Sequence, residues 1–132
     1  IVAEWLDADP RIEFVNWAGL PAHPHNERAK KYLPEGPGSV FSFGVRASQT
    51  QGAREAGQRF IESVNLASHL ANIGDAKTLV IHPASTTHAQ LTEQQLIDAG
   101  VLPGVVRISV GIEDPEDIVD DLDQALTQAT KG

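Results

Sequence analysis

The segment 105–112, VVRISVGI, constrains the fold more than any other part of the chain. Apolar side chains occupy every second position and therefore share one face of an extended strand: Val106, Ile108, Val110 and Ile112. A strand with one apolar face needs neighbouring strands beside it and helices over that face. Arg107, Ser109 and Gly111 then point to the opposite face of the sheet.

Two other segments have the helical periodicity needed to cover such a strand. The C-terminal one has Pro115 just inside its start and acidic residues in its first turn, where the helix dipole favours negative charge. Its apolar positions form one stripe: Ile118, Leu122, Ala125, Leu126 and Ala129. A second stripe falls between residues 53 and 64: Ala53, Gly57, Phe60, Ile61 and Val64. We expect both stripes to be buried against the sheet.

The rest of the chain continues this alternation of strands and helices, with short loops between them. Further strands are predicted at residues 11–17, 39–47 and 79–81. Shorter helices are predicted at residues 1–6, 26–33 and 92–100. The first of these helices starts without a cap, so we expect it to continue upstream. The pattern predicts one domain of α/β (α+β) class over residues 1–132, with a small mixed or antiparallel sheet and helices packed on one face.

Charge and composition exclude several classes of partner. The net charge of −8 argues against nucleic acid, because phosphate contacts need clustered Lys and Arg. The longest apolar runs, such as residues 78–81, are too short to span a bilayer, so we expect no membrane partner. The chain has no cysteine and no secretion signal pattern, which is compatible with the cytoplasmic location that we expect.

Much of the negative charge lies in one segment. Its acidic residues are Glu113, Asp114, Glu116, Asp117, Asp120, Asp121 and Asp123. A calcium loop would need alternating carboxylates with a glycine near the middle, and this segment has no such glycine. We therefore interpret it as a solvated, acid-capped helix.

Arg107 is the residue most suggestive of binding chemistry, because it lies in mid-strand between apolar residues. Its guanidinium could form an internal salt bridge or lie on a solvated outer face. It could also bind a carboxylate through two parallel hydrogen bonds, which its planar fork suits. The pattern alone leaves these alternatives open.

Other reactive side chains give weaker signals. His23 with His25, and His82 with His88, could each form a metal pair, but no third ligand has a telling spacing, so we expect structural histidines and no metal. Ser109 has no neighbouring base in the sequence, and the chain has no G-x-S-x-G nucleophile elbow. None of the lysines looks like a desolvated Schiff-base residue: Lys30, Lys31, Lys77 and Lys131. The residues therefore predict no catalytic group and no cofactor-binding group in this chain.

Four motifs together resemble the Cys/Met-metabolism enzymes that depend on pyridoxal phosphate (PLP). Residues 106–114, VRISVGIED, resemble the closing signature of that family. Residues 19–24, GLPAHP, are similar to the segment that opens the family's C-terminal domain. Residues 72–79, NIGDAKTL, and 82–88, HPASTTH, match two more motifs in the family's order.

The resemblance implies the C-terminal domain of a fold-type-I PLP enzyme, a homotetramer whose cofactor-binding large domain precedes this chain. It implies that the domain binds the α-carboxylate of a small amino-acid substrate through Arg107. Asn72 falls where many relatives carry Ser beside that carboxylate, and Thr87 matches a Thr that lines the same corner. Because the family's Schiff-base lysine and phosphate-binding residues lie outside this chain, we expect the isolated chain to bind no PLP and to be inactive.

Residues 71–74, ANIG, narrow the resemblance further. Cystathionine-handling relatives often have Glu-Ser-Leu-Gly there, whereas this segment and residues 82–88 look more like the O-acetylhomoserine sulfhydrylases. The implied reaction is a γ-replacement in methionine biosynthesis, in which sulfide displaces acetate from O-acetyl-L-homoserine to give L-homocysteine. A fragment of a cystathionine γ-synthase or γ-lyase, and a non-catalytic binding module, remain the alternatives.

Overall fold

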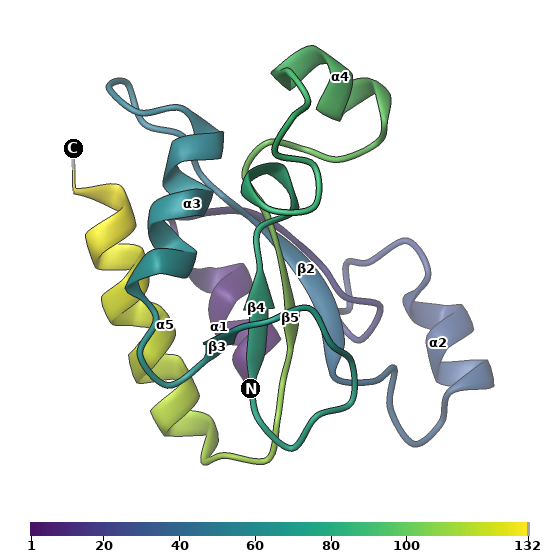
Figure 1. Ribbon diagram of the computed structural model, residues 1–132. Coiled ribbons are helices and arrows are strands. Elements are labelled where there is room, and N and C mark those ends of the chain that lie inside the picture. The colour runs from purple at the N-terminus through teal and green to yellow at the C-terminus, as the bar shows by residue number, and fades with distance from the viewer. Residues whose placement is uncertain (132) are drawn as a thin grey trace.

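The computed structural model describes residues 1–131 and contains one mixed sheet covered by helices (Figure 1). The strands are β1 (Ile12–Asn16), β2 (Val40–Val45), β3 (Ser68–His69), β4 (Leu79–Ile81) and β5 (Val105–Ser109). The helices are α1 (Val2–Ala8), α2 (Asn26–Tyr32), α3 (Ala53–Ser63), η1 (Pro83–Ser85), α4 (Glu93–Asp98) and α5 (Pro115–Thr130). The predicted fold class, a small sheet with helices packed on one face, is confirmed.

The strand order is β1-β2-β5-β4-β3, which places β5 in the middle of the sheet. β5 pairs antiparallel with both β2 and β4, and β1 pairs antiparallel with β2. The short edge strand β3 runs parallel to β4 and was not predicted. With only two residues, β3 shows no periodicity that a sequence pattern could reveal.

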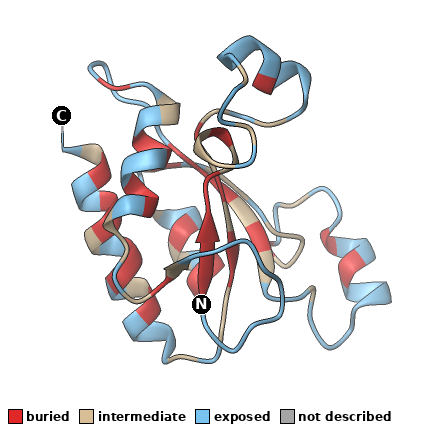
Figure 2. Ribbon diagram, viewed as in Figure 1, coloured by how far each residue is buried: buried red, intermediate tan, exposed pale blue. Residues whose placement is uncertain are grey.

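The core lies between the sheet and the helices α1, α3 and α5, whose inner surfaces are buried (Figure 2). Val106 and Ile108 of β5 are fully buried there, as are Leu122 and Leu126 of α5. Phe60 of α3 is also fully buried, and its ring packs edge-to-face on Phe43 of β2, with ring centroids 5.5 Å apart. The apolar stripes predicted for α3 and α5 therefore cover the face of β5 that carries Val106 and Ile108.

The predicted strand 105–112 is too long at its C-terminal end. β5 ends at Ser109, and Ile112, which the alternation places in the core, is 86% exposed. The backbone N–H of Ile112 still donates to the carbonyl of Ala76, but the strand itself ends three residues earlier. Gly111 permits this turn, because a Cβ atom there would collide with the same carbonyl.

The acidic segment is also less solvated than its composition suggests. Asp114 caps α5 as expected, accepting a hydrogen bond from the N–H of Glu116. Asp121, however, is only 7% exposed, and its carboxylate accepts the backbone N–H groups of residues 65, 66 and 67. Glu113 accepts hydrogen bonds from Thr78. Two of the acids predicted to be solvated therefore stabilise turns of the fold.

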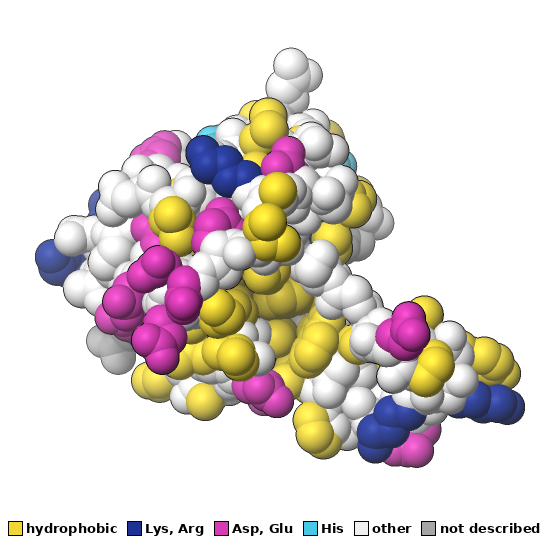
Figure 3. Space-filling view, turned by 90° about the horizontal axis from the view of Figure 1, so that it is seen from below, with side chains coloured by type: hydrophobic (Ala, Val, Ile, Leu, Met, Phe, Trp, Pro, Cys, Tyr) yellow, Lys and Arg dark blue, Asp and Glu magenta, His cyan; other side chains and the backbone are white. Residues whose placement is uncertain are grey.

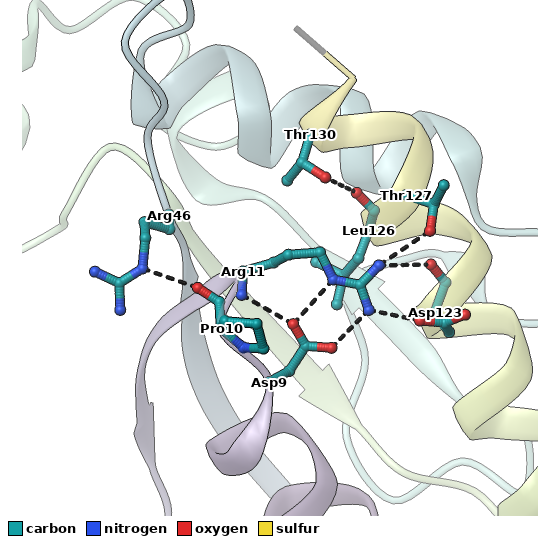
Figure 4. A network of polar contacts seen from close by, with 8 residues as sticks. All are labelled: Asp9, Pro10, Arg11, Arg46, Asp123, Leu126, Thr127 and Thr130. Carbon is teal, nitrogen blue, oxygen red and sulfur yellow. Dashed lines mark hydrogen bonds and ion pairs between the residues drawn. The ribbon is translucent and has the colours of Figure 1, made fainter.

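A polar network joins the turn between α1 and β1 to helix α5 (Figure 4). The guanidinium of Arg11 donates to the carboxylates of Asp9 and Asp123 and to the hydroxyl of Thr127. The hydrogen bond with Arg11 lowers the pKa of Asp9, and the hydrogen bond with Asp9 raises the pKa of Arg11. Both groups therefore stay charged at neutral pH, and the network fixes α1 against α5.

Candidate functional site

The face of the sheet away from α1, α3 and α5 carries a row of aligned side chains. Strand register places Asn16 of β1, Ser42 of β2, Arg107 of β5 and Ile81 of β4 side by side in that order. Neighbouring strands lie about 4.8 Å apart, so the side chains of this row leave one face of the sheet at that spacing. Arg107 thus lies on the face opposite Val106 and Ile108, between Ser42 and Ile81.

Arg107 opens into a groove of about 340 Å³. Its walls include Asn16 and Ser42 together with the apolar side chains of Phe14, Val105 and Leu102. Among residues 1–131 the guanidinium of Arg107, which is half-buried, forms no ion pair, and no acid lines the groove. A cation without a protein counter-charge, beside apolar walls, suits a small anion that also has an apolar part.

Asn72 lies in the loop between β3 and β4, which approaches the same face of the sheet. Its side-chain oxygen accepts the N–H of Ile73, and its side chain is exposed. The loop approaches the sheet where the N–H of Gly74 meets the hydroxyl of Ser109, at 3.4 Å. Ser109 is two residues from Arg107 on β5, so this loop and Arg107 share one face, although Asn72 does not line the groove.

Thr87 lies in the turn that follows η1 and is exposed, with its hydroxyl 2.8 Å from Nδ1 of His88. It does not line the groove with Arg107. Pro83, at the start of η1, does line it, so the turn leaves from the groove's edge. The structure therefore places the three predicted site residues around the open face, but only Arg107 in the groove.

Two residues anchor the turn carrying Thr87: Arg54, which the sequence did not single out, and His82, which was expected to be a structural histidine. Arg54 of α3 donates hydrogen bonds to the carbonyls of Ala84, Ala89 and Leu91. His82 is fully buried, and its ring nitrogens lie 2.8 Å from the hydroxyl of Ser85 and 2.6 Å from the carbonyl of Pro103. Burial lowers the pKa of His82, which keeps it neutral and structural at pH 7.

The candidate metal ligands and the lysines of residues 1–131 lie apart from the Arg107 groove. Within residues 1–131 no cluster of three His, Cys, Asp or Glu side chains could hold a metal ion. All four lysines are exposed, and Lys30 pairs with Glu27, so none has the desolvated environment that activates a Schiff-base lysine. In the same part of the chain, no helix is both long and apolar enough to cross a membrane.

A second hollow lies on the side where the chain begins. It has a volume of about 280 Å³ and is lined mostly by apolar residues, among them Val2 of α1, Phe41 of β2 and Ile118 of α5. Figure 3 views this side and shows apolar side chains gathered in the hollow. Glu113, at its rim, is fully engaged with Thr78, so this hollow offers little polar chemistry compared with the Arg107 groove.

Comparisons with known proteins identify the family of this chain. The model of the family "Cys/Met metabolism PLP-dependent enzyme" matches residues 1–127. The chain is 50% identical over 125 residues to O-acetyl-L-homoserine sulfhydrylase 1 of Thermus thermophilus, covering 95% of this chain and 28% of that protein. It is 42% identical over 136 residues to the homocysteine/cysteine synthase of Saccharomyces cerevisiae, covering 99% and 31%.

A solved structure is also similar to this chain over almost its whole length. A putative O-acetylhomoserine (thiol)-lyase from Campylobacter jejuni, determined with N'-pyridoxyl-lysine-5'-monophosphate, superposes with a TM-score of 0.81 at 35% identity. The match covers 96% of this chain and 29% of that one. The chain thus spans less than a third of the length of these relatives.

Proposed function

Because this chain belongs to the Cys/Met metabolism PLP-dependent enzymes, we propose that it is the C-terminal, substrate-binding domain of an O-acetylhomoserine sulfhydrylase. In the proposed reaction, acetate leaves O-acetyl-L-homoserine and sulfide adds to give L-homocysteine. The enzyme names of the similar proteins support this assignment. The observation that carries it is the free guanidinium of Arg107 in a groove without acids.

Arg107 would bind the α-carboxylate of the amino-acid substrate. A guanidinium can donate two parallel hydrogen bonds to a carboxylate, which fixes both the position and the orientation of the group. Since Arg107 lies in the central strand β5, paired on both sides, its backbone is held rigidly. Such a support would keep the substrate in one orientation during the reaction.

Asn72 and Thr87 would complete the carboxylate site when the remaining part of the enzyme is present. The loop of Asn72 lies on the same face as Arg107, and the turn of Thr87 leaves from the groove's edge at Pro83. Both segments are exposed, so their side chains are accessible to a substrate bound at this face. Arg54 and His82 would then act indirectly, by holding the turn that carries Thr87.

PLP would be held by the part of the enzyme that precedes this domain, because no lysine of this chain fits a Schiff base.

We propose that the complete enzyme is a cytoplasmic homotetramer. This domain would then form about a third of the complete enzyme, since it matches 28% and 31% of the length of two relatives.

The test is a thiol preference assay with a full-length enzyme that contains this domain. O-acetyl-L-homoserine is supplied with sulfide in one reaction and with L-cysteine in another, and the products are separated by chromatography. We expect homocysteine to form at a much higher kcat/KM than cystathionine. A preference for L-cysteine would instead identify a cystathionine γ-synthase.

A further inference from the structure

Ser42 and Arg107 lie directly opposite each other on β2 and β5. Their side chains leave the sheet on the same face, and residues paired in this way have Cβ atoms about 4.5–5.5 Å apart. Both side chains line the groove, where each is half-buried. A hydroxyl and a guanidinium therefore open into the same groove from neighbouring strands.

The hydroxyl of Ser42 makes no hydrogen bond within the part of the chain that the structure describes. Arg107 cannot accept its proton, because a guanidinium has donors only. A half-buried hydroxyl with an unsatisfied proton costs free energy unless a ligand or water accepts it. Val, Ile or Thr would suit this interior strand better, so sheet stability does not account for a serine here.

We propose that Ser42 is a further substrate-binding residue, which donates its hydroxyl proton to the α-carboxylate held by Arg107. This inference rests on the function proposed for Arg107. A carboxylate offers about four lone-pair sites, so a bidentate pair with a guanidinium leaves sites for a third donor. No acid lines the groove to compete for either donor. Ser42 thereby strengthens the preference of the site for a carboxylate over a neutral group.

The test compares two probes in a full-length holoenzyme that contains this domain, with binding measured by titration calorimetry. L-norleucine and L-norleucinamide differ only at the α-carboxyl group, and neither has a γ-substituent that can leave. Ser42→Ala should raise the Kd of L-norleucine about tenfold, the effect of losing one hydrogen bond to a charged group. The Kd of L-norleucinamide should change by less than about threefold, since a neutral amide is a weaker acceptor.

Two further variants distinguish the loss of a hydrogen bond from a general effect on folding. Ser42→Thr retains the hydroxyl and should bind L-norleucine within about threefold of the parent, whereas Ser42→Cys, a weak donor, should resemble Ser42→Ala. Equal losses for both probes in Ser42→Ala would mean that Ser42 only shapes the groove, which overturns the inference.

Arg107→Lys, measured in parallel, separates this inference from the function on which it rests. If Arg107→Lys weakens L-norleucine binding and Ser42→Ala does not, the carboxylate site stands and the role of Ser42 is overturned. If neither variant changes binding, the carboxylate lies elsewhere and both proposals are overturned.

Discussion

Thr78 and Glu113 are joined twice: the carboxylate of Glu113 accepts hydrogen bonds from both the backbone N–H and the hydroxyl of Thr78, each at 2.7 Å. The hydroxyl oxygen of Thr78 in turn accepts the N–H of Gly111, at 2.9 Å. The pair thus connects the start of β4 to the turn between β5 and α5. Burial acts to raise the pKa of Glu113, but the hydrogen bonds from Thr78 outweigh it and lower the pKa overall.

Glu113→Gln should therefore destabilise this chain by about 1–2 kcal/mol at pH 7, since a charge-assisted acceptor is lost. Because the folded pKa is lowered, the contribution is present above the unfolded pKa of about 4.3 and is lost as pH falls through the folded value. Urea denaturation at pH 7 and near pH 3 measures it. Glu116→Gln, an exposed neighbour, is the control. An equal difference between Glu113→Gln and the parent at both pH values would contradict this account.

Asp121→Asn should cost more than a surface substitution, about 2–3 kcal/mol in chemical denaturation. The carboxylate accepts three backbone N–H groups between α3 and β3, and an amide would turn a donor toward some of them. Asp120→Asn, exposed on the same helix, provides a matched control and should change stability by less than about 0.5 kcal/mol. Similar costs for the two variants would show that the buried acceptor is not stabilising.

Leu122→Ala should destabilise the chain by about 2–5 kcal/mol, because Leu122 is fully buried under the sheet. Ile112→Ala should cost less than about 0.5 kcal/mol, although period two places Ile112 in the same core. Denaturant titrations of both variants compare the buried stripe with the position that the pattern misassigned. A loss of more than about 1 kcal/mol for Ile112→Ala would indicate that Ile112 is packed rather than exposed.

The contrast between Leu122 and Ile112 shows what the sequence could predict. Leu122 belongs to a stripe that continues over several helical turns, so the period locates it reliably. Ile112 continues the alternation of β5 in sequence only, because the strand ends at Ser109 and Gly111 lies against the backbone carbonyl of Ala76, which is far away in the sequence. Strand ends depend on such long-range contacts, which a local pattern does not contain.

The same reasoning applies to the candidate site. Arg107 could be predicted as a site residue because the alternation within its own strand shows which face its guanidinium lies on. Ser42 could not, because its importance comes from the register between β2 and β5, which pairs it with Arg107. Asp121 was assigned to a solvated surface for a related reason: the N–H groups that donate to its carboxylate, those of residues 65–67, come from a turn that only the tertiary fold brings to α5.

Added PLP should not form a saturable imine with this chain alone, because all four lysines are exposed and none is desolvated. Absorbance titration in the visible and near-ultraviolet range measures this, with Lys77→Ala and Lys131→Ala as controls for weak surface reaction. A saturable band that only partly disappears in these variants would place a cofactor lysine in this domain.

The most direct test of the central claim is kcat/KM for O-acetyl-L-homoserine in a full-length enzyme with Arg107→Lys. Lysine keeps the charge but cannot donate two parallel hydrogen bonds to a carboxylate. We predict that kcat/KM falls at least about tenfold, since a charge-assisted hydrogen bond contributes about 1.5–3 kcal/mol. PLP content and circular dichroism should stay unchanged, and Arg107→Ala should be worse. A near-normal kcat/KM in either variant would contradict the account and leave Arg107 without a role in substrate binding.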